Sequence, residues 1–380
     1  MRKIWLILIA GILLRIFLSY STFHPDTLAF KLGGEVVASG KILNLYDFSD
    51  PNIAVLNYPP LIYFFHGLFN FIGGFLGGTQ AVKLPYIIFD ILAFFVFLRL
   101  FPLAKDASLA VALWIFNPIN LYATYMMGQF DIIPTFFTLL SVYFAAKKRL
   151  YASALALGFG IAFKLYPLFF IIPLILLSKN FLERVKLVIL AALPYTLSVI
   201  PYIGSPSFRE NALLTSQTSK SLYAAIPVSG GESILLFPLF LILFYMMILK
   251  KDLVSSSVWK FYSIPLLLFF IFTHFHPQWL IWLSPFLIID LVSNRFKNLL
   301  PISIAMVCWF ISLFFFDPSL SVRLFAPLFP GLQNVADIWT LLNLSIDYNF
   351  LRSLVQSIFS AALIYLLYKF FPTNEYSKSK

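Results

Sequence analysis

The sequence predicts an all-α polytopic membrane protein. Of its 380 residues, 61% are hydrophobic and 11% are charged, and the mean hydropathy is +0.90, whereas soluble domains carry about 25% charged residues. The apolar runs are long and continuous, as in 4–14 and 266–273, and lack the alternation of an outer-membrane barrel. At about 20 apolar residues for each spanning helix, we expect about twelve spans in a single integral membrane domain, residues 1–380.

Short basic clusters give the expected topology. They punctuate the chain from Arg2-Lys3 through Lys147-Lys148-Arg149 to the C-terminal tail, and the positive-inside rule places them in the cytoplasm. With both termini inside, this requirement predicts spans near residues 4–20, 82–101, 108–125, 129–147, 150–164, 166–179, 187–203, 234–250, 258–275, 278–292, 299–316 and 350–371.

The net charge of +11 is explained by this topology. Most of the 27 Lys and Arg residues fall on the cytoplasmic side, and most of the 16 Asp and Glu residues fall outside. The basic charge therefore reports membrane orientation, and nucleic acid is excluded as a partner. The single cysteine, Cys308, excludes an intramolecular disulfide and a cysteine-based metal site.

Three long outer segments remain between the spans. They are residues 21–81, 204–233 and 317–349, and residues 372–380 form a cytoplasmic tail. The apolar stretch 61–78 is long enough to cross the membrane, but a crossing there would place Lys147-Lys148-Arg149 outside. We therefore expect this stretch to form a juxtamembrane or re-entrant helix within the first outer loop.

Charged residues inside spans are candidates for function, because each costs about 3 kcal/mol on insertion scales. For three of them a structural role is favoured: Arg15 could snorkel to the outer interface, Asp90 could hydrogen-bond within the bundle, and Asp290 lies near the inner interface. Lys164 differs, because Pro167 disfavours α geometry just before it. This break near the outer leaflet would let the Lys164 cation face a polar cavity.

Polar residues at the outer ends of the spans complete the candidate set. Asp26 directly follows the first span, so its carboxylate is expected at the outer interface. Asp131 in Gly128-Gln129-Phe130-Asp131 opens a span at the same level, or is a first-turn acid favoured by the helix dipole. His274 and His276 have a spacing that does not suit zinc, so we expect bonds to a sugar or phosphate. Tryptophans at the membrane boundaries are explained as interfacial belt residues: Trp279, Trp282 and Trp339.

These residues, in this order, resemble the GT-C class of multispanning glycosyltransferases, and most closely the catalytic subunits of glycosylphosphatidylinositol mannosyltransferase I and their prokaryotic relatives. The match runs from about residue 15 to residue 290. The residues that carry it are Arg15, Asp26, Tyr58-Pro59-Pro60-Leu61, Lys83 with Asp90, Asn117-Pro118, Gly128-Gln129-Phe130-Asp131, Lys164-Leu165-Tyr166-Pro167 and Gln278-Trp279-Leu280-Ile281-Trp282.

The resemblance implies a GT-C-like bundle of about twelve transmembrane helices, with juxtamembrane helices in a large first outer loop. It implies transfer of a hexose, with mannose favoured, from a polyprenyl-phosphate donor to a lipid or glycan acceptor. The family places a catalytic Asp in the first outer loop, as an Asp-x-Asp pair in the eukaryotic enzyme. In His24-Pro25-Asp26 only the second acid is matched, which weakens a metal-binding role. No metal site and no required cofactor are expected, with a divalent cation left open.

The chemistry of a lipid-linked donor explains why these residues gather at one depth. The donor phosphate lies at the interface, so a carboxylate and cations are needed there. We expect an inverting displacement with Asp26 as the general base. The expected ligands of the donor phosphate are Lys164, Lys83 and His276. The expected sugar or acceptor contacts are Asp131, Gln129, Glu35, His274 and Gln278.

Two other interpretations stay open at this point. Twelve spans with intramembrane charges also describe a transporter or lipid flippase, although no second copy of the motifs is found. A catalytically inactive scaffold of the same fold is the third hypothesis. The expected location is a prokaryotic cell membrane with the site facing outward, or the endoplasmic reticulum in a eukaryote. A small membrane subunit is considered as a further partner.

Overall fold

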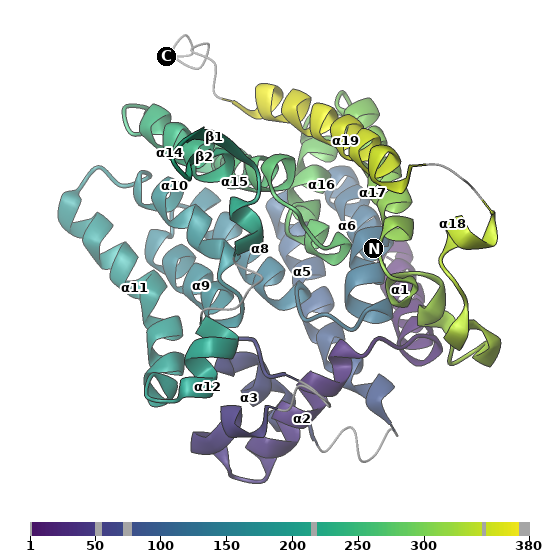
Figure 1. The fold of residues 1–380 in the computed structure, drawn as a ribbon. Helices are drawn as coiled ribbons and strands as arrows, with labels where there is room; N and C mark the ends of the chain where they lie inside the picture. Colours follow the sequence, from purple (N-terminus) through teal and green to yellow (C-terminus); the bar gives the residue numbers. More distant parts are fainter. Residues whose placement is uncertain (1, 50–54, 71–77, 214–218, 344–346, 372–380) are drawn as a thin grey trace.

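The computed structural model describes residues 2–49, 55–70, 78–213, 219–343 and 347–371. Within these ranges the protein is a helical bundle with one two-stranded sheet (Figure 1). The helices of the first half are α1 (Arg2–Ser21), α2 (Asp26–Ala38), α3 (Pro60–Leu68), α5 (Ile87–Leu100), α6 (Ala104–Ile115), α7 (Pro118–Asn120), α8 (Ile132–Ala146), α9 (Leu150–Phe163), α10 (Ile171–Ile175) and α11 (Phe181–Val199). Those of the second half are α12 (Pro206–Phe208), α14 (Leu236–Ile248), α15 (Val258–Phe272), α16 (Ser284–Ser293), α17 (Leu299–Ser312), α18 (Ile338–Leu341) and α19 (Tyr348–Phe370).

The predicted all-α membrane class is confirmed, and each of the twelve expected spans coincides with an apolar helical segment. Six of these segments are long and apolar enough to cross a bilayer: Lys3–Ser21, Thr79–Leu100, Ala104–Met126, Phe181–Tyr202, Ser255–Phe272 and Tyr348–Phe370. The other six have 10–17 residues: Ile132–Ala146, Leu150–Phe163, Tyr166–Ile175, Leu236–Ile248, Ser284–Ser293 and Leu299–Phe315. A total of twelve crossings stays a prediction.

The first outer loop contains short helices, as expected. Helix α3 has nine residues, about 13 Å at 1.5 Å per residue, which is far shorter than the roughly 30 Å hydrocarbon core. It packs closely on α2, where a Cβ at Gly33 would overlap the ring of Tyr63. The rest of the 61–78 prediction falls partly on 71–77, outside the described residues.

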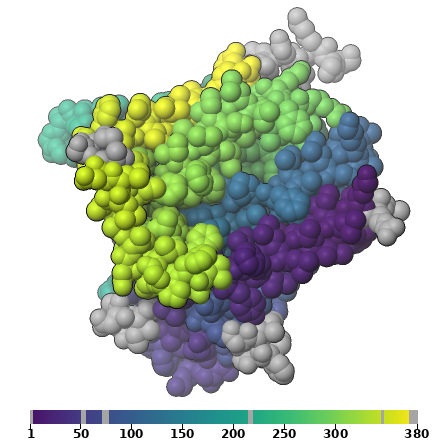
Figure 2. Space-filling view, turned by 90° about the vertical axis from the view of Figure 1, so that its right-hand side faces the viewer, coloured from purple at the N-terminus to yellow at the C-terminus, as the bar shows by residue number. Residues whose placement is uncertain are grey.

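The outer loops meet at one end of the bundle. Helices α2, α3 and α12 lie together at the lower end in Figure 1, and the Tyr202 hydroxyl donates to the Ile42 carbonyl at 2.9 Å. On another face, α1 (purple) lies near the C-terminal segments (green to yellow) in Figure 2. There the Phe23 N–H donates to the Leu324 carbonyl at 2.9 Å. Segments far apart in sequence thus enclose one region beside the start of α2.

A β-hairpin interrupts the second outer loop, which sequence reasoning did not anticipate. Strands β1 (Ala225–Ser229) and β2 (Glu232–Leu235) pair antiparallel, with Ile226 opposite Ile234. The turn places Gly230 and Gly231 at φ of 53° and 98°, a region that glycine reaches without steric cost.

Two intramembrane acids are held by hydrogen bonds inside the bundle. Asp90 accepts from Asn120 at 2.7 Å and pairs with Arg15 at 2.8 Å, as expected for a structural role. Arg15 is fully buried, so the expectation that it snorkels to the interface is wrong, because Asp90 and the Ile115 carbonyl at 2.9 Å satisfy its guanidinium in place. Asp290 accepts from Asn298 at 2.9 Å.

Candidate active site

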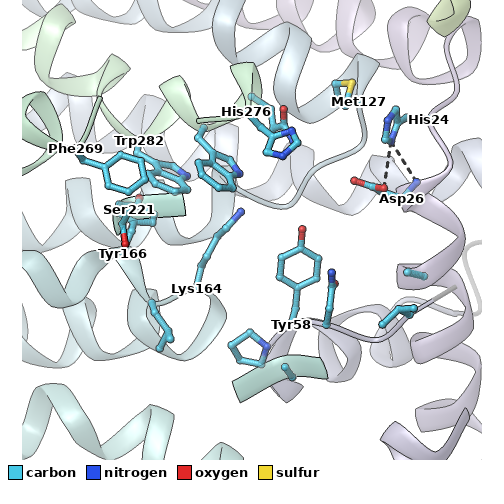
Figure 3. A pocket seen from close by; sticks show the side chains of 18 of the residues that line it. His24, Asp26, Tyr58, Met127, Lys164, Tyr166, Ser221, Phe269, His276 and Trp282 are labelled. Carbon is cyan, nitrogen blue, oxygen red and sulfur yellow. Dashed lines mark hydrogen bonds and ion pairs between the residues drawn. The ribbon is translucent and has the colours of Figure 1, made fainter. Parts of the chain in front are cut away.

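A cavity of about 640 Å³ opens at the start of α2 and at the end of α9, in the region that the sequence predicts to lie at the outer face. One part of its wall is polar, with His24, Asp26, Lys164 and His276 (Figure 3). Another part is apolar and aromatic: Leu165, Leu168, Phe169, Phe269, Trp279 and Trp282. Ligand sites typically combine an apolar wall with a few polar groups, so this cavity is the candidate site.

The Asp26 carboxylate is held on one side and open on the other. Its Oδ2 accepts from Gln129 Nε2 at 2.6 Å, while its Oδ1 lies 3.6 Å from His24 Nδ1. The Asp26 side chain is 46% exposed. Burial lowers the pKa of the neighbouring His24, although the Asp26 charge raises it. Its Nδ1 accepts from the Asp26 backbone N–H at 3.2 Å.

The backbone around Gly128 brings Gln129 to Asp26. Gly128 has a φ of 71°, and a Cβ there would overlap Thr27 in the first turn of α2. The turn after the π-helical segment Leu121–Met126 can therefore approach α2 only because residue 128 is glycine. This close approach places the Gln129 amide on the carboxylate.

Lys83 lies behind this contact and not in the cavity. It is fully buried, and its Nζ donates to the Thr22 carbonyl at 2.8 Å and the Tyr125 carbonyl at 2.9 Å. Lys83 is absent from the residues that line the cavity. The expectation that it contacts the donor phosphate is therefore not met by this geometry, because its three ammonium donors are directed to backbone and hydroxyl oxygens of the bundle.

Lys164 stands at the predicted helix break. It follows the last residue of α9 with extended φ and ψ of −158° and 141°, and its Nζ donates to Asp131 Oδ1 at 2.7 Å. The same oxygen accepts from Trp282 Nε1 at 2.5 Å. Asp131 is fully buried, and its Oδ2 has no hydrogen-bond partner in the described chain. Asp131 thus supports Lys164 and Trp282, and the Lys164 cation still lines the cavity.

Four aromatic rings surround the Lys164 ammonium. Its Nζ lies 5.3–5.7 Å from their centroids, within cation–π range; the rings belong to Tyr58, Phe130, Trp279 and Trp282. Burial raises the pKa of Tyr58 well above 10, so its hydroxyl stays neutral. The cage restricts the ammonium to one place at the cavity wall.

The two histidines of the predicted outer turn have different positions. His276 lines the cavity, and its Nε2 accepts from Lys220 Nζ at 2.6 Å. His274 lies outside the lining, with its Nδ1 3.4 Å from Arg352. Burial and the nearby cations lower the pKa of His276 to about 3 and that of His274 to about 4, so both rings are neutral at pH 7.

Lys220 is the residue that sequence reasoning missed. It begins the short helical segment Lys220–Leu222 in the second outer loop, and its ammonium reaches His276 at the cavity wall. No motif surrounds it. Its location in an outer loop was the only available signal.

The structure therefore brings together most of the predicted site residues, but not all. Asp26, Lys164, His276 and Gln278 line the cavity, and Gln129 and Asp131 bond directly to lining residues. The others lie elsewhere: Lys83, His274 and Glu35, whose carboxylate pairs with Lys31 on the surface of α2 at 3.7 Å. Glu35 can make this exposed i,i+4 pair because its side chain points away from the cavity. In the described part of the chain, no group of three or more His, Cys, Asp or Glu residues could hold a metal ion.

The central segment of the chain is similar to a known protein family. Residues 125–202 match the family model "Mannosyltransferase (PIG-M)". The resemblance predicted from the sequence is confirmed. The matched segment includes Gln129, Asp131 and Lys164, which either line the cavity or bond to residues that do.

Two curated mannosyltransferases are similar to the chain. GPI mannosyltransferase 1 of Kluyveromyces lactis is 28% identical over 197 residues, which are 47% of this chain and 46% of the relative. The enzyme of the same name from Trypanosoma brucei brucei is 36% identical over 80 residues, which are 21% of this chain and 18% of the relative. The chain thus spans less than half the length of either relative.

Among solved structures, ArnT from Cupriavidus metallidurans bound to undecaprenyl phosphate aligns with 96% of this chain and 76% of its own. The sequence identity is 14% and the TM-score is 0.45. The same protein in the apo state gives a TM-score of 0.46.

Proposed function

We propose that the protein is a membrane mannosyltransferase that moves a hexose from a polyprenyl-phosphate donor to a hydroxyl of a lipid or glycan acceptor. One observation carries the proposal. A half-exposed carboxylate, Asp26, is fixed by Gln129 at the wall of a cavity that also bears Lys164 and His276. The family match over residues 125–202 supports mannose as the sugar.

The proposed reaction is a single inverting displacement. Asp26 takes the proton of the acceptor hydroxyl as that oxygen attacks the anomeric carbon of the donor. The bond from this carbon to the phosphate oxygen breaks, and its electron pair leaves with the polyprenyl phosphate.

Cations at the cavity wall would stabilise the departing phosphate. Lys164 lines the cavity, and Lys220 reaches it through its hydrogen bond to His276. Fixed donors aimed at developing negative charge lower the barrier without reorganisation. We propose these three side chains as the phosphate site, with Lys220 in place of Lys83.

The apolar wall suits a lipid-linked donor. Leu168 and Phe169 line the cavity, and Leu168 is 43% exposed on the molecular surface. A polyprenyl chain would lie along such a surface in the bilayer while its phosphate stays at the polar wall. The location of the cavity among the outer helix ends also supports an enzyme at one membrane face, whereas a transporter site is expected near the midplane.

The test uses the purified full-length protein in nanodiscs. It is incubated with undecaprenyl-phosphate mannose or dolichyl-phosphate mannose and with a membrane lipid extract that supplies the acceptor hydroxyl, with the corresponding glucose lipids as sugar controls, and release of polyprenyl phosphate is measured. We expect consumption of a mannose lipid and little of the glucose lipids. The proposal is wrong if every donor remains intact while the protein moves a sugar lipid across vesicle membranes.

A further inference from the structure

Three aromatic rings form a continuous stack in the cavity wall. Tyr166 and Trp282 stack with centroids 4.3 Å apart at 6°, and Trp282 and Trp279 stack at 5.3 Å and 13°. All three line the cavity, and Tyr166 and Trp282 are labelled in Figure 3. They come from two segments, Tyr166–Phe170 and Pro277–Trp282, so the stack forms only when distant parts of the chain pack together.

Trp282 and Tyr166 are held in place by polar contacts, whereas Trp279 is not. Trp282 donates to Asp131, and the Tyr166 hydroxyl lies 3.2 Å from the Thr135 hydroxyl. The Trp279 indole N–H makes no hydrogen bond within the described chain. Tyr and Trp usually find a partner for their polar atom when they are buried. Trp279 thus ends the stack with a donor free for a ligand.

These tryptophans do not behave as interfacial belt residues, which corrects the expectation from the sequence. Trp5 on the surface of α1 is 50% exposed, whereas Trp279 is 9% and Trp282 is 4% exposed. Their rings therefore face the protein interior and the cavity. Trp339 donates to the Phe314 carbonyl at 2.8 Å, and its assignment to the interfacial belt stays a prediction.

Beside the stack, the side-chain oxygen of Gln278 receives no hydrogen bond. Gln278 lines the cavity and is 6% exposed, and its Oε1 has no hydrogen-bond partner in the described chain. A buried polar atom left unpaired destabilises the folded protein. A ligand that donates a hydrogen bond would remove this cost.

An aromatic ring beside an unpaired hydrogen-bond acceptor favours a sugar ring as the ligand group. A lipid tail would leave the Gln278 oxygen unpaired, and a phosphate would repel it, since both are acceptors. A pyranose ring offers an apolar C–H face to an aromatic ring and hydroxyl donors at its edge. We propose that the hexose of the donor stacks on Trp279 and donates a hydroxyl to Gln278, an assignment that rests on the proposed function.

The test compares ligands that share parts of the donor. Binding of undecaprenyl-phosphate mannose, undecaprenyl phosphate and methyl mannoside to the full-length protein is measured for the wild type and for Trp279→Leu, Trp279→Phe and Gln278→Leu. Trp5→Leu is the matched control, because it removes an exposed tryptophan that does not line the cavity. Melting temperatures verify that each variant is folded.

Trp279→Leu and Gln278→Leu should each weaken binding of the mannose lipid and of methyl mannoside roughly three- to tenfold. Undecaprenyl phosphate should bind as in the wild type, and Trp279→Phe should restore most of the loss because it keeps a ring. Equal weakening of both lipids, or no weakening of either sugar ligand, would overturn the assignment. If the wild type binds methyl mannoside through Trp279 but neither lipid, the hexose site stands and the proposed donor is wrong.

Discussion

Two buried ion pairs in this protein have different surroundings. In the bundle, Arg15 and Asp90 are both almost completely buried, and the carboxylate also accepts from Asn120 and from the Tyr125 hydroxyl. At the cavity wall, Lys164 pairs with Asp131, but the Lys164 side chain is 13% exposed and Asp131 Oδ2 has no partner in the described chain. The first pair is fully satisfied by the protein, whereas the second leaves the Lys164 cation partly exposed at the cavity and one buried oxygen of Asp131 without a partner in the described chain.

The largest effect on stability is expected from breaking the Arg15–Asp90 pair. Asp90→Ala would leave the Arg15 guanidinium buried without a counter-charge, which costs about 3–5 kcal/mol when one partner of a buried pair is removed. We expect a large fall in melting temperature and in yield of folded protein. Asp252→Ala is the control, since the Lys179–Asp252 pair is about 90% exposed and such pairs contribute about 0–1 kcal/mol. Equal melting temperatures for both variants would contradict a structural role of Asp90.

In the Lys164–Asp131 pair, a substitution should mainly change the affinity for the polyprenyl-phosphate sugar. Lys164→Gln keeps a group that can donate to Asp131 but removes the charge at the cavity. A hydrogen bond to a charged group contributes about 1.5–3 kcal/mol, so donor affinity should fall about ten- to a hundredfold while the protein stays folded. The measurement is donor binding per folded molecule.

Lys83→Gln tests whether the buried lysine behind the cavity contributes to donor binding. Because Lys83 bonds to the Thr22 and Tyr125 carbonyls behind the site, this variant should lose stability and keep donor affinity per folded molecule. If Lys83→Gln lowers the donor affinity as much as Lys164→Gln does, the phosphate site includes Lys83.

A smaller effect is expected from pH. The folded pKa of His276 is about 3 and that of His274 about 4, both below the ordinary value of 6.5, through burial first and then through nearby cations: Lys220 and Lys164 for His276, and Arg352 and Lys220 for His274. The unfolded chain takes up protons below about pH 6.5 that the folded protein does not bind, so stability should fall as the pH decreases from about 6.5 to 4. His276→Gln should make the melting temperature decrease less over this range. An unchanged slope would show that the ring is protonated in the folded state.

Much of the fold could be predicted from the sequence, because the positions of the apolar helical segments depend on local hydropathy. The same logic places Asp26, Lys164 and His276 at one depth, and the cavity contains all three. Depth does not determine which side of a helix faces a cavity. Lys83 illustrates this limit. It lies at the outer start of the expected span 82–101, but its ammonium donates to backbone carbonyls of two other segments.

The aromatic wall could not be predicted for a related reason. Tyr166 and Trp279 are 113 positions apart in the chain, and their common stack depends on how two short helical segments pack. Near a membrane boundary, composition alone favours the interfacial belt. The β-hairpin was missed because its strands are four and five residues long and contain a proline, which weakens any strand signal.

The central claim is that Asp26 is the general base, and Asp26→Asn tests it most directly. Asparagine keeps the shape of the side chain and loses its proton affinity, and general base catalysis typically contributes 10² to 10⁴ in rate. Turnover of the polyprenyl-phosphate mannose donor should therefore fall by about this factor for each folded molecule, with donor binding nearly intact, whereas Asp47→Asn, at an exposed position of the same loop, should retain full turnover. Near wild-type turnover of Asp26→Asn would contradict the account.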